Sequence, residues 1–251
     1  MSLLRLMTFN IRHGERPDGV IDLEAVAGTI DEAGADVVGL QEVDRYLPRS
    51  GCRDQAAEIA GALGWHHAFQ AAMTGEGLYG AHRSGYGIAV VSRHPILFRY
   101  GERLASSRGR EARAFLHVEL PWGTSGSFHL VCTHLGLDQA ERLVHVERIL
   151  AYGQQLPPSK AVVGDWNALP ESEEVRAMTA RWVDAATEAP GSPEPTFSYR
   201  SEPPGRPNVR IDYVFIDPGL QADEVHVGSA RVSDHLPVIA TLRRREVERE
   251  I

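Results

Sequence analysis

Short apolar runs that end in polar residues recur throughout the chain and set its expected structure. Runs of roughly 4–8 apolar and β-branched residues, bounded by glycine, proline or polar residues, are typical of β-strands. The strands that this pattern predicts are Leu3–Phe9, Asp36–Leu40, Trp65–Gln70, Tyr86–Ser92, Ile96–Tyr100, Ala112–Leu120, Ser127–Thr133, Lys160–Gly164, Val209–Ile216, Gln221–Val227 and Pro237–Leu242.

Apolar residues at helical spacing predict helices between several of these strands. Within Leu23–Glu32, the apolar residues Val26 and Ile30 fall on one face, and Asp22 is placed to cap the first turn. Many strands with intermittent helices favour an α/β (α+β) sandwich over a regular βαβ winding. No repeat or linker divides the chain, so we expect a single domain over residues 1–251. The expected helices are Leu23–Glu32, Asp54–Leu63, Asp138–Gln155 and Glu173–Ala180, and the expected long loops are Met73–Ser84 and Pro190–Pro207.

The composition is that of a soluble globular protein, with 43% hydrophobic and 24% charged residues. The 26 basic and 34 acidic residues leave a formal net charge of −8, which argues against attraction of the whole molecule to nucleic acid. The two cysteines, Cys52 and Cys132, form no disulfide framework, and the apolar run at the N-terminus is too short for a signal peptide or a membrane span. We therefore expect a reduced, cytoplasmic protein.

The segment Ala161–Pro170, AVVGDWNALP, carries the first candidate site. An apolar strand runs directly into Asp165 and Asn167, and alternate residues of an extended chain point the same way. A carboxylate and an amide aimed at one point suit the binding of a water, a phosphate or a metal-bound oxygen. The alternative is a polar turn in which both side chains satisfy backbone groups.

Further polar side chains stand at or near the ends of other predicted strands. Asp212 lies within the apolar segment RIDYVFI, where a buried carboxylate needs a partner. Each of the others, taken alone, has an ordinary reading as a surface acid, a structural histidine or a turn residue. Their joint occurrence indicates a catalytic centre. These other residues are Asn10, Glu42, His134, Asp234 and His235.

Seven motifs follow one another in an order that closely resembles the endonuclease/exonuclease/phosphatase family, the metal-dependent phosphohydrolases with a DNase I-like fold. The combination of GDWNA and SDHLPV is the specific part of this resemblance, which spans about Leu3 to Leu242. It implies a four-layer α/β/β/α sandwich of two mixed β-sheets, with the active site where strand ends from both sheets converge. The motifs are FNIRHG (Phe9–Gly14), LQEVD (Leu40–Asp44), YGIAVVSRHPI (Tyr86–Ile96), THLGLD (Thr133–Asp138), GDWNALP (Gly164–Pro170), RIDYVFI (Arg210–Ile216) and SDHLPV (Ser233–Val238).

The resemblance implies a metal site built from oxygen ligands. By analogy with the motifs of the family, Glu42 would be the main Mg²⁺ ligand, with Asn10 beside it and Asp234 as a further ligand. Carboxylates and water are the ligands that Mg²⁺ prefers, and Mn²⁺ is the alternative metal.

The same resemblance assigns catalytic roles to five residues. Asp165 would orient or deprotonate the attacking water, and Asn167 would hold a phosphoryl oxygen. His235 would face the phosphate, with its imidazole aligned by Asp212. His134 would be a second donor to the developing phosphorane.

Two positions depart from the pattern of related sequences. Arg12 stands where members that cleave DNA at abasic sites have an acid, and Ile88 stands where related bacterial sequences often have asparagine. At Ile88 the chain lacks an amide that would contact the substrate or support the site, although Tyr86 remains in place.

Arg45, Arg110 and Arg113 are, with Tyr86, the candidates for binding the rest of the substrate, because arginine forks suit phosphate. The alternative for the arginines is an ordinary surface role in solubility, which we favour for Arg45. The expected reaction is hydrolysis of a phosphodiester by in-line attack of an activated water. The acidic net charge and the lack of long insertions favour a small or lipid-derived phosphate ester. An endonuclease or exonuclease acting on nucleic acid is one alternative, and a non-catalytic binding protein with the same fold is another.

Overall fold

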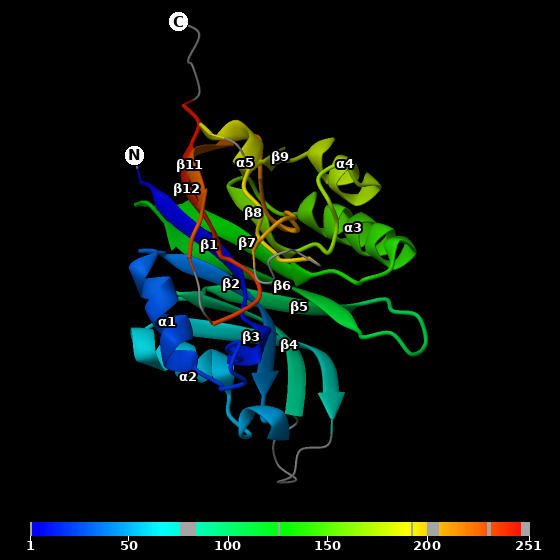
Figure 1. The fold of residues 1–251 in the computed structure, drawn as a ribbon. Coiled ribbons are helices and arrows are strands. Elements are labelled where there is room, and N and C mark those ends of the chain that lie inside the picture. Colours follow the sequence, from blue (N-terminus) through cyan, green and yellow to red (C-terminus); the bar gives the residue numbers. More distant parts are fainter. Residues whose placement is uncertain are drawn as a thin grey trace, which may run out of the picture.

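The computed structural model describes residues 2–75, 84–124, 126–191, 193–199, 206–229 and 232–246, which form two stacked sheets with helices outside (Figure 1). Each sheet has six strands. The first, in the order β11-β12-β1-β2-β4-β3, consists of β1 (Leu4–Asn10), β2 (Val37–Arg45), β3 (His66–Gly75), β4 (Ser84–Ser92), β11 (Leu220–Val227) and β12 (Val238–Arg244). The second, in the order β5-β6-β7-β8-β10-β9, consists of β5 (Phe98–Leu104), β6 (Arg113–Trp122), β7 (Gly126–His134), β8 (Lys160–Asp165), β9 (Val183–Asp184) and β10 (Asp212–Ile216).

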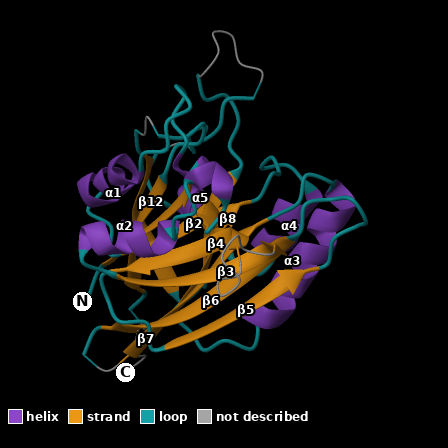
Figure 2. Cartoon of the chain, turned by 90° about the horizontal axis from the view of Figure 1, so that it is seen from below, coloured by secondary structure: helices purple, strands orange, loops and turns teal. Residues whose placement is uncertain are grey.

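Both sheets are mixed, as the sequence predicts. The pairs β1–β2 and β7–β8 are parallel, and the other pairs that the described residues form are antiparallel. The helices cover the two outer faces (Figures 1 and 2). They are α1 (Leu23–Glu32), α2 (Gln55–Leu63), α3 (Gln139–Gly153), α4 (Glu173–Thr179) and α5 (Ala185–Glu188), together with 3₁₀ turns at Arg12–Gly14 and Pro48–Ser50.

The alternation of side chains along each strand divides the core into three layers. On β1, Leu6 points between the two sheets, whereas its neighbour Met7 packs under α1 and α2. On β8, Val163 lies between the sheets, and Val162 packs under α3 and α4. The layers therefore follow one another as helix, sheet, sheet and helix, which confirms the predicted sandwich.

Several predicted boundaries are wrong in informative ways. The strand expected to end at Leu40 continues through a bulge to Arg45. In the segment 73–84, which we expected to be a loop, residues 73–75 belong to β3 and Ser84 begins β4, while residues 76–83 lie outside the described part. The strand expected from Val209 begins only at Asp212, because the backbone of Val209 instead pairs with Phe197.

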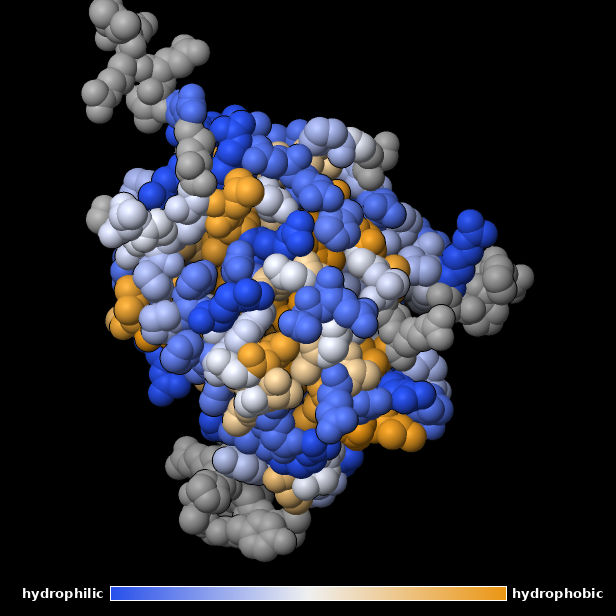
Figure 3. Space-filling model, turned by 90° about the vertical axis from the view of Figure 1, so that its left-hand side faces the viewer, coloured by the Kyte–Doolittle hydropathy of each residue, from blue (hydrophilic) through white to orange (hydrophobic). Residues whose placement is uncertain are grey.

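The side of the molecule shown in Figure 3 mixes hydrophilic residues with smaller apolar areas. This is the side on which α1, α2 and β11 lie in Figure 1. In the described part of the chain, none of the helices combines the length and apolar character that a membrane crossing requires.

Candidate active site

Strand register places three of the candidate residues side by side at one edge of the second sheet. His134 at the end of β7 is the neighbour of Asp165 at the end of β8, and Asp212 at the start of β10 is the neighbour of Asp165 on the other side. All three side chains are buried. Gly164 makes this packing possible, because a Cβ there would lie 2.0 Å from the carbonyl oxygen of Thr133.

Asn10 connects this row to the first sheet. Its Nδ2 donates to Glu42 Oε1 and to Asp165 Oδ2, both at 3.0 Å, and its Oδ1 accepts from the backbone N–H of Arg12 at 3.0 Å. The amide is completely buried. In this orientation the nitrogen of Asn10 faces the site, so the residue holds two carboxylates together as a hydrogen-bond donor.

Glu42 lies at an irregularity within β2. The register of β2 against β4 shifts between Gln41 and Val43, and Glu42 has a φ of 58°, which is uncommon for a residue other than glycine. A bulge re-aims the side chain that it carries. The half-buried carboxylate of Glu42 thus reaches Asn10 from within the strand and not, as expected, from just beyond its C-terminal end.

His235 and Asp212 form the predicted pair. His235 Nδ1 lies 2.9 Å from Asp212 Oδ2, which also accepts from the hydroxyl of Thr196 at 2.6 Å. A carboxylate only accepts hydrogen bonds, so Nδ1 carries a proton. The other ring nitrogen, Nε2, lies 3.6 Å from Asp165 Oδ2. Phe197 covers the ring, with the two ring centroids 4.5 Å apart.

The electrostatics of the two histidines differ. Burial lowers the pKa of His235, but the carboxylates of Asp212 and Asp165 outweigh it and hold that pKa well above the ordinary value. Burial, and next to it the charges of Arg113 and His235, keep the pKa of His134 well below its ordinary value. Burial raises the pKa of Asp165 despite the opposing charge of His235. The site therefore favours a cationic His235 beside a neutral His134.

The tautomer of His134 follows from its neighbours. Arg113 Nη1 lies 3.2 Å from His134 Nδ1, and an arginine can only donate, so Nδ1 is the acceptor. Nε2 then carries the proton, and the acceptor that faces it is Asp165 Oδ2 at 3.4 Å. Asn167 Nδ2 lies 3.1 Å from Nε2, but both atoms are donors in this tautomer, and the amide donates to the carbonyl of Leu135 at 3.1 Å.

Asn167 reaches the site by a different route from the one we expected. Strand β8 ends at Asp165, and Asn167 follows in a left-handed conformation with a φ of 48°. Its backbone N–H donates to Asp165 Oδ1 at 2.9 Å. Asp165 and Asn167 do come together, but through a turn closed by the aspartate and not through strand alternation.

Asp234 stands apart from the hydrogen-bonded centre. Its side chain is exposed, and Ser233 Oγ lies 3.4 Å from its Oδ1. It adds to the negative charge that raises the pKa of His235. Its predicted role as a metal ligand stays a prediction.

The four candidate substrate residues lie in different environments. Arg113 is 5% exposed and is paired with Glu111 and His134. Tyr86 is also buried, and burial, followed by the nearby charge of Glu42, raises the pKa of its hydroxyl. Arg45 stacks on Phe69, with 4.6 Å from the guanidinium carbon to the ring centroid.

Arg110 differs from these, because it is exposed and ion-paired with Asp138 at 3.2 Å. The second departure, Ile88, is buried between the two sheets, so it belongs to the core.

Two residues with a part in the site carried no signal in the sequence. Thr196 donates to Asp212, and Phe197 covers His235, but both come from a proline-rich segment that reads as an irregular loop. Their backbones pair with Val209, and Phe197 also forms a bridge with His235. Only this tertiary pairing reveals their role.

The donor set fits a hard divalent cation. Asp165, Asp212 and His235 have ligand atoms within 4.8 Å of one another, and the Asn10 amide links the carboxylate of Glu42 to that of Asp165. His235 is a poor ligand, because the two carboxylates favour its protonated form. Oxygen ligands remain, and these suit Mg²⁺ or Mn²⁺.

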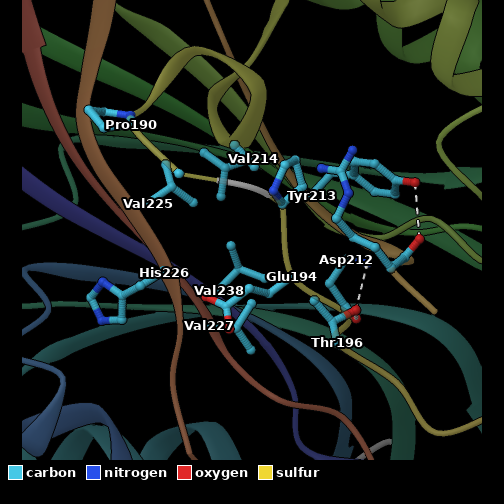
Figure 4. A pocket seen from close by; sticks show the side chains of 14 residues that line it. Pro190, Glu194, Thr196, Asp212, Tyr213, Val214, Val225, His226, Val227 and Val238 are labelled. Atoms are coloured by element: carbon cyan, nitrogen blue, oxygen red, sulfur yellow. Dashed lines mark hydrogen bonds between the residues drawn. The ribbon is translucent and has the colours of Figure 1, made fainter. Parts of the chain in front are cut away.

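A cavity of about 180 Å³ adjoins Asp212, which is one of its lining residues (Figure 4). Thr196 and Asp212 contact each other at its edge, and Val214 and Val238 line its apolar part. Asp212 Oδ1 has no hydrogen-bond partner among the described residues.

The sequence matches the model of the endonuclease/exonuclease/phosphatase family over residues 7–235, and the chain belongs to this family. The match contains every residue of the centre described above. The resemblance predicted from the seven motifs is thereby confirmed.

The individual proteins to which the chain is similar share less than a third of its residues. The uncharacterized protein YbhP of Escherichia coli K12 is 28% identical over 164 residues, which is 62% of this chain and 62% of that protein. An endonuclease/exonuclease/phosphatase structure from Beutenbergia cavernae is similar with a TM-score of 0.78 and 26% identity, and covers 97% of this chain and 72% of that one. A mannosyl-6-phosphatase from Bacteroides thetaiotaomicron has a TM-score of 0.72 at 17% identity over 96% of this chain and 99% of that one, and shows the fold alone.

Proposed function

We propose that the protein is a divalent-metal-dependent phosphoesterase that hydrolyses a phosphodiester by in-line attack of water. The observation that carries the proposal is the position of Asp165 Oδ2. It accepts from Asn10 at 3.0 Å and lies 3.4 Å from His134 and 3.6 Å from His235. Burial raises the pKa of this carboxyl to about 7 despite the donors around it, and those donors fix its orientation, as a general base requires.

Each residue of the centre has a role in this reaction. Asp165, whose pKa is raised by burial, accepts the proton of the attacking water, and Asn167 helps to hold that water and a phosphoryl oxygen. Cationic His235, held by Asp212, donates to a phosphoryl oxygen as negative charge develops. His134 donates from Nε2, because Arg113 occupies its Nδ1.

Glu42 would hold the metal, with the exposed Asp234 as a further ligand, and Asn10 would position Glu42. The bound cation would supply charge to stabilise the transition state and the leaving oxygen. Mg²⁺ fits this oxygen-rich set, and Mn²⁺ is the second choice.

Small or lipid-derived phosphate esters fit the molecule better than long nucleic acid. The net charge is −8. Of the candidate arginines, Arg110 is paired with Asp138 and Arg113 with Glu111, so neither adds an unpaired positive charge to the site. Nucleic acid binding depends on many phosphate contacts, which such pairs do not provide.

The test is hydrolysis of an aryl phosphodiester and the matching monoester, in EDTA, Mg²⁺ and Mn²⁺. We expect metal-dependent turnover that is lost in His235→Ala and in Glu42→Ala. The exposed His66, remote from the centre, provides the matched control His66→Ala. Absence of turnover with both esters, together with calorimetric Mg²⁺ binding that does not depend on Glu42, would reject the proposal in favour of a non-catalytic binding protein.

A further inference from the structure

An apolar pocket opens directly beside the candidate active site. Its volume is about 530 Å³, which lies within the range of ~300–1,000 Å³ common for small-molecule sites. Asn167 forms the wall that faces the centre. The rest of the lining is Leu137, Leu169, Phe197, Tyr199, Val209 and Ile211.

The pocket and the centre share two walls. Asn167 lines the pocket and contacts the ring of His134 at 3.1 Å. Phe197 lines the pocket and lies against the ring of His235, with 4.5 Å between the ring centroids. A phosphoryl group at the centre would therefore have one substituent at the mouth of the pocket.

Hydrogen bonds hold the far wall of the pocket in place. The backbone of Phe197 pairs with Val209. The side chain of Asn208 accepts from the backbone N–H of Tyr199 and donates to its carbonyl, both at 2.8 Å. The wall is thus formed before any ligand arrives, which reduces the entropy lost on binding.

The chemistry of the lining selects an apolar occupant. Leu137 is 71% exposed and Leu169 is 42% exposed, so two large aliphatic side chains face water at the rim. The amide nitrogen of Asn167 already donates to the carbonyl of Leu135. No charged side chain belongs to the described lining, so a second phosphate or a sugar would find few partners there.

We propose that this pocket binds a hydrocarbon substituent of the phosphoester, and hence that the substrates are phosphoesters that carry an alkyl chain. The proposal rests on the proposed function, because it assumes that the phosphate binds at the centre. Burying a methylene chain against the aliphatic side chains removes apolar surface from water and is favourable, whereas a nucleobase would leave its polar edge without hydrogen-bond partners.

The experiment measures binding and needs no turnover. Methyl-, butyl- and octylphosphonate, which cannot be hydrolysed, are titrated calorimetrically into the protein with Mg²⁺ and with EDTA, below micellar concentrations. We expect affinity to rise roughly two- to fourfold per methylene, since a fully buried methylene contributes about fourfold. The phosphonate analogue of adenosine 5′-monophosphate serves as the comparison for an aromatic occupant.

A double variant tests the pocket directly. The double variant Leu137→Ser with Leu169→Ser should leave the affinity for methylphosphonate unchanged. It should remove most of the increase in affinity from methyl- to octylphosphonate. Both residues are exposed, so the fold should tolerate the changes. Leu97→Ser with Val144→Ser, which are also exposed but do not line the pocket, should keep the full gain.

Three results would overturn the inference: no dependence on chain length, a dependence that survives in the pocket variant, or tighter binding of the adenosine analogue than of octylphosphonate. Failure of the proposed function gives a different result, because turnover of the aryl esters is then absent with every metal, whether or not the phosphonates bind.

Discussion

At the scale of single residues, the centre depends on which side chains donate hydrogen bonds and which accept them. Asn10 offers one amide nitrogen to two carboxylates, and Asp212 accepts from both Thr196 and His235. Changing a donor into an acceptor should therefore destabilise the centre more than deleting it, and replacing an accepting carboxylate by an amide should weaken the pair that it holds. Asn10→Asp and Asp212→Asn, which hardly change the shape of the side chain, test these two expectations.

Asn10→Asp should destabilise the protein more than Asn10→Ala. The new carboxylate would face Glu42 and Asp165 at hydrogen-bond distance without a donor between them. Leaving buried groups unpaired costs about 1–3 kcal/mol, and like charge adds to this. Urea unfolding at pH 7 in EDTA measures the difference. Equal stability of the two variants would show that Asn10 does not hold the carboxylates together.

Asp212→Asn should lower kcat on the order of 10²–10⁴-fold with little change in KM. The amide keeps the shape but weakens the hold on His235 Nδ1 and removes the charge that favours its cationic form. Steady-state kinetics with the aryl diester measure the effect. Asp223→Asn, at a partly exposed ion pair on β11, is the control and should keep full activity.

At the scale of elements, the site is a product of register. His134, Asp165 and Asp212 are neighbours because β7, β8 and β10 lie side by side with their polar ends aligned. This alignment requires a close approach between β7 and β8 at Gly164. Gly164, which has no side chain to take part in chemistry, is thus needed for the geometry of the candidate active site.

Gly164→Ala should destabilise the fold by at least about 2–3 kcal/mol and abolish activity. Its Cβ would lie 2.0 Å from a backbone oxygen, so the strands must separate. Gly61→Ala in α2 is the matched control, because no atom lies within 4 Å of its Cβ position. That change should be neutral or stabilising by about 0.5–1 kcal/mol. Thermal unfolding compares the two, and equal effects would contradict the argument.

Much of this arrangement could be predicted from the sequence. The apolar runs gave the positions of most strands, and the ordered motifs gave the family and the sandwich. The bulge that re-aims Glu42 could not be predicted, because a bulge is defined by pairing with β4. The contribution of Thr196 was equally hidden, since its hydroxyl meets Asp212 only after a proline-rich segment folds back.

At the scale of the whole molecule, buried polar groups also lie far from the centre. His117 on β6 contacts the hydroxyl of Tyr152 on α3 at 2.9 Å and the ring of His129 on β7 at 3.2 Å. His117 is 3% exposed, and burial lowers its pKa to about 4. Burial also lowers the pKa of His129.

This pair should make the fold sensitive to mild acid. Between pH ~6.5, where histidine titrates in the unfolded chain, and pH 4, the unfolded state binds more protons than the native state, so stability falls as pH falls. His117→Gln should reduce that loss by about 2 kcal/mol, measured by urea unfolding at pH 7 and pH 4.5. His66→Gln, at an exposed position, should leave the pH dependence unchanged.

The first sheet is completed by strands from opposite ends of the sequence, since β12 pairs with β1. During synthesis, β1 therefore gains this neighbour only after β12 has been made. His235 precedes β12, and Asn10 and Asp165 are 155 positions apart. A polypeptide that ends before His235 and β12 would thus carry most of the polar groups of the centre without bringing them together.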